Sequence, residues 1–307
     1  PIFLLVCLPL ALLPYLVALP IWLAATGALY WRMARAWLGE RFGAMPAFAF
    51  PAVLINVGHG QNAFLSAALF GGGAFWLQRR PILAGLCFGA LAYKPHLGLM
   101  IPVALAIAGR WKSFVAAGVA VAALAGVSYA VFGLETWRAF LADSSLARSS
   151  LEQGLVGDGK MQSAFAAVRL WGGPLGLAYA VQGAAAAFAA GALFWLHRRV
   201  PRGGAEGPAM IVAALIASPF LLDYDLLILA APLAWMLREG VRTGFLPWEK
   251  SLLVAAFVLP AVSRMLATQL ALPLAPFVMA ALLLAVLRRG AMADTRAPAP
   301  AQAIGLT

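Results

Sequence analysis

Long apolar segments separated by short polar connections run along almost the whole chain, and this pattern most constrains the fold. The segments cover 14–37, 46–57, 62–77, 81–93, 95–109, 111–132, 174–196, 208–222, 225–237, 249–268 and 271–287. A further apolar stretch, 2–12, is broken by Pro9 and Pro14 and is expected to lie along a membrane interface. Because a backbone in lipid must satisfy its own hydrogen bonds, each segment is expected to be helical. The pattern predicts an all-α, polytopic transmembrane bundle with about 10–11 membrane segments.

Composition excludes the main alternatives to a membrane protein. The 307 residues are 64% hydrophobic and 11% charged, whereas soluble domains are about half apolar and a quarter charged. Cys7 and Cys87 lie far apart in apolar segments and are interpreted as small hydrophobic residues, so we expect neither a disulfide framework nor a metal site. A soluble core and a secreted disulfide scaffold are therefore excluded, and no nucleic-acid partner is expected.

The basic residues predict the orientation. Lys and Arg are retained on the cytoplasmic side of a membrane protein, which gives the net charge of +11 a topological explanation. Alternate connections carry most of the 22 basic residues: Arg32, Arg35, Arg41, Arg79, Arg80, Arg110, Lys112, Arg198, Arg199, Arg202, Arg238, Arg242, Lys250, Arg288, Arg289 and Arg296. With these connections inside, the remaining connections face outside, and a plasma-membrane protein with an external functional face is predicted.

Several apolar segments are too short for a simple crossing. A segment of about 13 residues rises only about 20 Å as a helix, less than the hydrocarbon thickness of about 30 Å. Such segments are either re-entrant or buried helices, or they end in a protein-lined, water-filled cavity. The polar residues at their outer ends favour the second interpretation.

We expect residues 1–289 to form one membrane domain with an external loop at about 134–171. The first half of this loop is expected to be helical and its glycine-rich second half, "GLVGDGKMQS", to be mobile. The Pro/Ala-rich residues 290–307 are expected to form a disordered cytoplasmic tail. Because the sequence begins at Pro1 without an initiator Met or a signal-peptide pattern, we expect its natural start to be missing.

Polar clusters from distant parts of the sequence converge on the predicted external side. They are "NVGHGQN" with His59, Gln61 and Asn62, "YKPH" with Tyr93, Lys94 and His96, the acidic loop with Glu135, Asp143, Glu152, Asp158 and Lys160, "SPFLLDYD" with Asp223 and Asp225, and the outer end of a later span with Arg264. The convergence predicts a substrate site at one membrane depth.

Each cluster also has a purely structural interpretation. Lys94 and His96 either anchor a helix end at the interface or bind a phosphate, because Lys is a point cation and His a second donor. Asp223 and Asp225 either cap a helix or act as base, sugar-hydroxyl acceptor or metal ligand. "GHGQN" is either a glycine turn or a set of groups that hydrogen-bond sugar hydroxyls or phosphate oxygens.

The order of these motifs resembles glycosyltransferase family 87, one of the C-type, membrane-embedded glycosyltransferases. The likeness is carried by "GHGQN", the "RRP" turn, "GALAYKPHLGLMIPVALAIAGRWK", "FGLETWRAFL" and "SPFLLDYDLLILAAPLAW", and extends from Pro1 to about Arg289. "AYKPH" with the upstream "GQN" is the most specific part.

The resemblance implies an enzyme that moves a sugar, mannose or another hexose, from a polyprenyl-phosphate donor to a lipid or glycan acceptor on the external face. Asp223 and Asp225 would be catalytic, and His59, Gln61, Asn62, Tyr93, Lys94, His96 and Arg264 would bind substrate. In such enzymes the principal carboxylate lies in the first external loop, and this sequence begins downstream of that loop. No nucleotide-binding motif is visible, no cofactor or metal is expected, and the donor, the acceptor and membrane lipids are the expected partners.

Two other function classes remain. A transporter or lipid flippase tends to show repeated halves and polar sites near the bilayer midplane, whereas here the charges lie at outer helix ends. A non-catalytic scaffold of envelope assembly would not need acidic and basic groups to converge.

Overall fold

The computed structural model describes residues 1–200 and 203–295, with the backbone alone for residues 144, 147, 158 and 293–295, and this part is entirely helical apart from loops and one isolated bridge. Its elements in chain order are α1 Ile2–Ala11, α2 Tyr15–Leu38, α3 Met45–Phe48, α4 Ala52–His59, α5 Ala63–Trp76, α6 Pro81–Ala90, η1 Leu91–Tyr93, α7 Pro95–Gly98, α8 Met100–Ile107, α9 Trp111–Ala142, α10 Ser144–Glu152, η2 Asp158–Lys160, α11 Ala164–Leu170, α12 Leu175–Arg199, α13 Glu206–Ala217, η3 Asp223–Leu229, α14 Ala230–Thr243, α15 Glu249–Leu270 and α16 Leu274–Thr295. The predicted all-α membrane bundle is confirmed.

Five helices are long and apolar enough to cross a membrane by length and composition: α2, α9, α12, α15 and α16. Their apolar windows are mostly exposed, with only 6% of the window buried in α9 and 44% in α16. Exposed apolar helix surface of this extent is expected where lipid is the solvent. The protein is an integral membrane protein, and the shorter apolar helices pack within and around these five spans.

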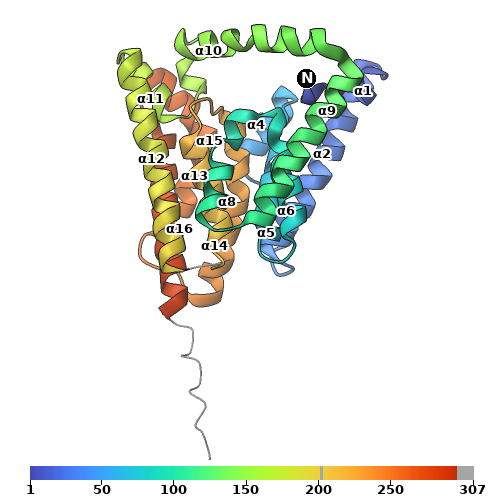
Figure 1. The fold of residues 1–307 in the computed structure, drawn as a ribbon. Helices are drawn as coiled ribbons and strands as arrows, with labels where there is room; N and C mark the ends of the chain where they lie inside the picture. The colour runs from blue at the N-terminus through green and yellow to red at the C-terminus, as the bar shows by residue number, and fades with distance from the viewer. Residues whose placement is uncertain (201–202, 296–307) are drawn as a thin grey trace, which may run out of the picture.

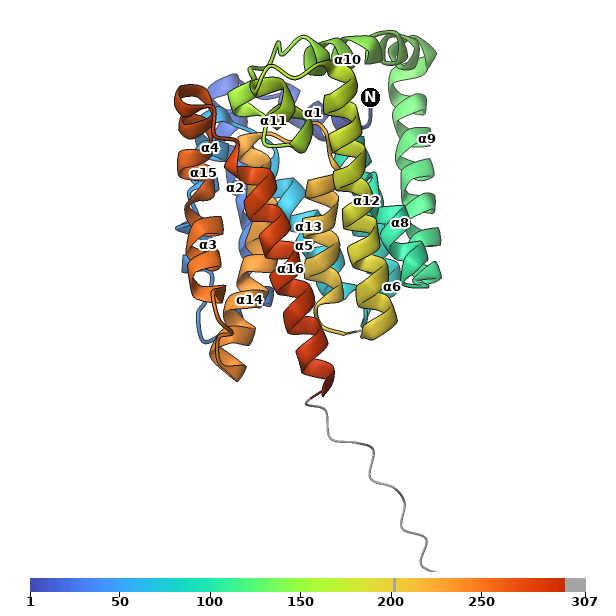
Figure 2. The same cartoon turned by 90° about the vertical axis from the view of Figure 1, so that its left-hand side faces the viewer.

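The centre of the bundle is α13, in which every residue from Gly207 to Ala217 is buried. It packs against α12, α16, α5, α8 and α14, so protein surrounds it on all sides (Figures 1 and 2). A helix of 12 residues rises about 18 Å, which is too short to span lipid alone. The short segment at 208–222 is thus a buried helix, the first of the two interpretations that the sequence left open.

Two predicted segments, 81–93 and 95–109, meet at a helix break. They form α6 with η1 and α7 with α8, and Pro95, directly after Lys94, begins the second segment as its first helical residue. Proline lacks an N–H and restricts the preceding residue, so it ends one helix and starts another. The predicted span at 225–237 likewise divides into a buried 3₁₀ helix, η3, and the α-helix α14. Both breaks place polar residues where a helix begins.

A bridge of residues 134–152 connects the top of α9 to the part of the chain that leads into α12. Gly133 adopts φ 76° and ψ 175° inside α9, a conformation that favours glycine. At this residue the chain turns from the direction of the span and runs across one end of the molecule as helix (Figure 1). The predicted helix in the first half of the loop at about 134–171 is confirmed.

The end of the second half of that loop packs against the bundle, while the expected mobility of the segment stays a prediction. Met161 and Gln162 are both 3% exposed. Met161 forms an antiparallel bridge with Leu222, and the Gln162 N–H donates to the carbonyl of Leu221 at 2.7 Å. A Cβ on Gly159 would lie 2.2 Å from Thr268 Cγ2, so the close approach of this segment to α15 favours glycine there.

The basic connections gather at the opposite end, which we call the basic face. Arg110 pairs with Glu206 through two hydrogen bonds, and the Gln78 amide donates to the carbonyl of Gly203 at 2.9 Å. Arg289 pairs with Glu249, and both side chains are buried. These contacts join the α5–α6, α8–α9 and α12–α13 connections and fix α16 to the α14–α15 turn.

The C-terminal helix is longer than expected. α16 continues to Thr295, beyond the predicted domain end at Arg289. The rest of the predicted disordered tail, residues 296–307, lies outside the described residues.

Candidate functional site

The site is built where two helix breaks meet. α13 ends at Ala217, and the chain then passes through the extended Ser218 (ψ 121°), a bend at 219–220 and the extended Leu222 (ψ 162°) before η3 begins at Asp223. An antiparallel β-bridge between Met161 and Leu222 holds this segment. η3 packs against α4, α5, α14 and α15, and α7 packs against α13, so the "YKPH" and "DYD" motifs are brought together.

Lys94 and Asp225 form a buried ion pair across 131 residues of sequence. Lys94 Nζ lies 2.6 Å from Asp225 Oδ1, and the two side chains are 10% and 1% exposed. The ammonium also lies 4.8 Å from the ring centroid of Tyr224. Asp225 Oδ2 accepts the Leu222 N–H at 3.4 Å, a weak cap at the start of η3. Asp225 is therefore both a helix-start residue and the counter-ion of Lys94.

Asp223 has a looser partner. Its Oδ1 accepts the Tyr224 N–H at 2.9 Å, while its Oδ2 lies 3.7 Å from Arg264 Nη1. The Asp223 side chain is 2% exposed and that of Arg264 is 52% exposed. A distance of 3.7 Å is longer than a hydrogen bond, so Asp223 retains an oxygen that can accept from another donor. Arg264 is the more accessible of the site's two cations.

Tyr93 connects the site to α5 and to the N-terminal helix. Its hydroxyl lies 2.8 Å from Ser66 Oγ, and its ring stacks on Phe3 with centroids 5.3 Å apart. Ser66 also donates to the carbonyl of Asn62 at 3.2 Å. Ser66 was not predicted as a site residue, because a single serine in an apolar helix carries no signal of what it faces.

His96 has a buried nitrogen without a partner. Its Nε2 is inaccessible and makes no hydrogen bond within the described residues, and its ring packs edge-on against Phe220 with centroids 5.6 Å apart. A buried polar atom without a partner costs about 1–3 kcal/mol. His96 thus keeps hydrogen-bonding capacity beside the Lys94–Asp225 pair.

The "GHGQN" segment forms a helix end followed by a helix start. α4 ends at Gly60, which adopts φ 61° and ψ 28°, and Asn56 Oδ1 accepts the Ala63 N–H at 2.8 Å at the start of α5. His59 is exposed, and its Nδ1 lies 2.9 Å from the carbonyl oxygen of Ile55. The turn interpretation accounts for Gly60 and Asn56, and Asn56 is a structural residue that sequence reasoning missed.

The predicted site residues fall into two groups. Lys94, Asp223, Asp225 and Arg264 form ion pairs at η3, and His96 packs on Phe220 just before it. Tyr93 is linked through Ser66 to the carbonyl of Asn62. Asn62, whose Oδ1 is buried without a partner, and the half-buried Gln61 lie in the turn before α5. The structure shows no contact between His59 and the Lys94–Asp225 pair. Within the described part of the chain, no group of three or more His, Cys, Asp or Glu residues could hold a metal ion.

Comparisons with known proteins give the family. No curated protein and no solved structure matches the chain significantly. The profile of glycosyltransferase family 87 matches residues 1–222, which is most of the chain and ends directly before Asp223. The match therefore includes Lys94 and His96. The segment "DYDLLILAAPLAW" lies beyond the match, so its resemblance to the family remains a prediction. Membership in this family implies glycosyl transfer and favours the enzyme over the transporter and the scaffold. The chain belongs to glycosyltransferase family 87.

Proposed function

We propose that this protein transfers a hexose, mannose in the first instance, from a polyprenyl-phosphate donor to a lipid or glycan acceptor. The observation that carries the proposal is the Asp223–Arg264 pair, a buried carboxylate with a free oxygen beside a half-exposed guanidinium. Sugar transfer from a lipid phosphate needs both an anion-binding group and a hydroxyl-binding group. An integral membrane protein suits a donor whose isoprenoid tail stays in lipid.

Arg264 is the proposed phosphate-binding residue. When the glycosidic bond breaks, negative charge grows on the departing polyprenyl phosphate, and a fixed cation stabilises that charge. Guanidinium binds phosphate with two parallel hydrogen bonds. Lys94 contributes to the same potential, but its ammonium is already held by Asp225 at 2.6 Å, so direct phosphate binding by Lys94 requires exchange of this partner.

Asp223 is the proposed catalytic carboxylate, which accepts a hydrogen bond from the acceptor or sugar hydroxyl. The acceptor oxygen forms the new bond to the sugar carbon, its proton leaves to a base, and polyprenyl phosphate departs. Asp225 acts mainly by positioning Lys94. His96, Asn62, Gln61, His59 and Tyr93 are proposed to contact the sugar or the phosphate, and the unpartnered atoms of His96 and Asn62 are the strongest of these candidates.

The proposal is tested by sugar transfer from a radiolabelled polyprenyl-phosphate mannose, with a nucleotide-linked mannose as the comparison donor. We expect transfer from the lipid donor only. Replacing Arg264 by alanine should raise the KM for the donor about 10–100-fold, the equivalent of one charged hydrogen bond, and Arg264→Lys should recover part of the loss. Arg148→Ala, which removes an exposed guanidinium from the bridge, is the matched control. An unchanged KM in Arg264→Ala would remove Arg264 from the donor site.

The active face is proposed to be external to the plasma membrane, on the side of the bridge. Basic connections at the opposite end support this orientation. In a background without Cys7 and Cys87, a membrane-impermeant thiol reagent applied to intact cells should label Leu155→Cys and leave Arg199→Cys unlabelled. Both positions are exposed. Lysed cells should show labelling at both, and the reverse pattern in intact cells would place the site inside.

A further inference from the structure

Lys160 is a half-buried cation at the end of η2. Its ammonium has no ion-pair partner among the side chains that the structure describes. An ammonium is costly to remove from water without a counter-ion, so a half-buried lysine of this kind indicates a place for an anion. The contacts of the residues on either side of Lys160 show which groups surround that place.

The residue after Lys160 brings it next to Asp223. Met161 forms the antiparallel β-bridge with Leu222. In an antiparallel pair, the residue before one partner lies beside the residue after the other. Lys160 precedes Met161 and Asp223 follows Leu222, so the backbones of Lys160 and Asp223 are neighbours at this β-bridge.

The residue before Lys160 brings it next to the helix that carries Arg264. Gly159 packs so closely on α15 that a Cβ there would lie 2.2 Å from Thr268 Cγ2. Thr268 lies one helical turn after Arg264, and its hydroxyl donates to the Arg264 carbonyl at 2.9 Å. Lys160 is therefore held on one side against the turn of α15 that follows Arg264 and on the other against the start of η3.

Gln162 fixes the shape of η2. Its side-chain amide donates to the carbonyls of Gly159 and Lys160, at 3.3 Å each. Its own N–H donates to the Leu221 carbonyl at 2.7 Å. Gln162 is 3% exposed, so water does not compete for these donors. The backbone of Lys160 is thus fixed, although its side chain has no described partner.

The charges around η3 show what Lys160 adds. The Lys94–Asp225 and Asp223–Arg264 pairs each cancel, so Lys160 gives this group of side chains a net positive charge. A sugar on polyprenyl phosphate is a phosphodiester with a single negative charge, and the departing phosphate monoester approaches two. An added cation therefore complements the donor and attracts the departing phosphate more strongly still.

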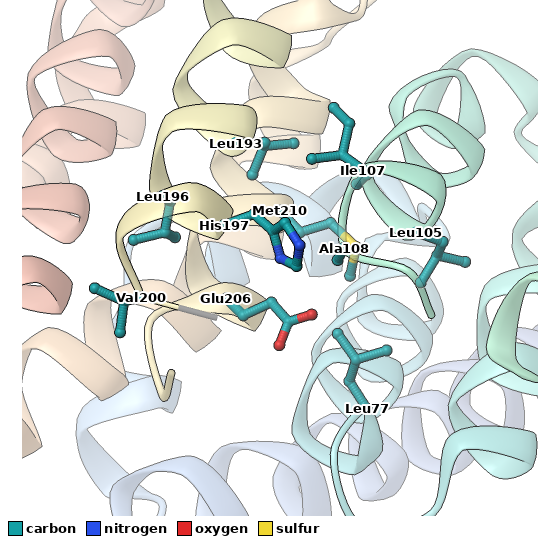
Figure 3. A pocket seen from close by; sticks show the side chains of 11 residues that line it. Leu77, Leu105, Ile107, Ala108, Leu193, Leu196, His197, Val200, Glu206 and Met210 are labelled. Atoms are coloured by element: carbon teal, nitrogen blue, oxygen red, sulfur yellow. The ribbon is translucent and has the colours of Figure 1, made fainter. Parts of the chain in front are cut away.

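A second hollow with polar side chains, at the basic face, does not offer a comparable anion site. His197 and Glu206 are among the residues that line it (Figure 3), and its volume is about 20 Å³, which is room for about one water molecule. The cation nearest to Glu206 is already engaged, because Arg110 donates to this carboxylate through Nε at 2.7 Å. A phosphate does not fit there, so the surroundings of Asp223 are the better site.

We propose that Lys160 is a second phosphate-binding residue, which contacts the phosphate of the lipid donor together with Arg264. This inference rests on the proposed sugar transfer and adds a residue to the same site. Lys160 forms no covalent bond and stays protonated, so that it offsets the charge left on the phosphate oxygens as polyprenyl phosphate departs. Its role differs from that of Lys94, whose ammonium Asp225 already holds at 2.6 Å.

The test compares binding of a short-chain polyprenyl phosphate with binding of the matching polyprenol, which lacks the phosphate, to the full chain in detergent. We expect the wild type to bind the phosphate more tightly. Lys160→Gln should weaken phosphate binding about 10-fold, the equivalent of one charged hydrogen bond, and leave polyprenol binding unchanged. Lys160→Arg should keep part of the preference. Arg138→Gln, which removes an exposed guanidinium from the bridge, is the matched control and should behave as the wild type.

Two further substitutions test the position of η2 separately from its charge. Gly159→Ala should reduce the preference for the phosphate, because the added Cβ would meet Thr268 Cγ2 and displace η2 from α15. Thr268→Ser removes that methyl group and keeps the hydroxyl that donates to the Arg264 carbonyl. The double variant Gly159→Ala/Thr268→Ser should therefore regain the preference, and Thr268→Ser alone should show it in full.

The outcomes separate this inference from the proposed function. An undiminished preference for the phosphate in Lys160→Gln or in Gly159→Ala, or an equal loss in Arg138→Gln, would overturn the role of Lys160. Sugar transfer by the wild type from polyprenyl-phosphate mannose would leave the proposed function standing in each of these cases. A wild type without such transfer would overturn the proposed function, and this inference with it.

Discussion

Replacing Asp225 by alanine is expected to lower the free energy of unfolding by about 3–5 kcal/mol. The substitution leaves the Lys94 ammonium buried without the carboxylate that lies 2.6 Å away, and an uncompensated buried charge is among the most costly defects in a folded protein. It also removes the acceptor for the Leu222 N–H. Thermal denaturation in detergent micelles would measure the loss as a lower midpoint.

Two further variants distinguish the ion pair from other causes. The double variant Lys94→Met/Asp225→Leu should recover most of the stability, because replacing both members of a buried pair by apolar residues is often neutral. Asp143→Ala, at an exposed position, should change the free energy of unfolding by no more than about 0.5 kcal/mol. If Asp225→Ala were as stable as Asp143→Ala, the pair would not form in the folded protein.

Replacing Asp223 by asparagine is expected to reduce the rate of sugar transfer about 100-fold or more, the contribution typical of a positioned acid or base, with little change in stability. Asparagine keeps the size of the side chain and still accepts the Tyr224 N–H through its amide oxygen, as the aspartate does at 2.9 Å. It removes the negative charge that would interact with a reacting hydroxyl and with Arg264. The measurement is transfer from polyprenyl-phosphate mannose in detergent, together with the denaturation midpoint.

The outcome for Asp223 separates the proposed role from capping. Asn is as good a residue as Asp at the start of a helix, so a purely structural Asp223 would give near-normal transfer in Asp223→Asn. Glu152→Gln, which removes a carboxylate that pairs with Arg148 in the bridge, is the matched control and should transfer normally. Equal rates in the two variants would exclude Asp223 from catalysis.

The sequence predicts the fold class and the clustering of polar residues at one end of the bundle, because both depend on where helices begin and end. Apolar segments locate the spans, and the alternation of basic connections places Tyr93, Lys94, Asp223 and Arg264 at the same end. The sequence does not predict which of these side chains pair with one another. The pairing depends on the rotation of each helix about its axis, and that rotation is set by packing that cannot be read from apolar segments. Hence the pairing of Lys94 with Asp225, and of Asp223 with Arg264, required the structure.

Other features left no sequence signal. The glycine-rich segment before α11 has no hydrophobic periodicity, so the burial of Met161 and its bridge to Leu222 were not foreseen. α13 was predicted as a span, but its central position follows from neighbours on every side. Ser66 faces Tyr93 only because α5 and η1 are adjacent.

The bridge of residues 134–152 has a mechanical consequence. α9 packs on α6, α8 and α1, and its apolar window is only 6% buried. Two helical rods, 134–142 and α10 with its nine residues, extend about 14 Å each and act as a strut between the ends of α9 and α12. A strut resists both separation and approach of the parts that it joins. It therefore fixes the spacing of two lipid-facing helices, α9 and α12, from one end of the bundle.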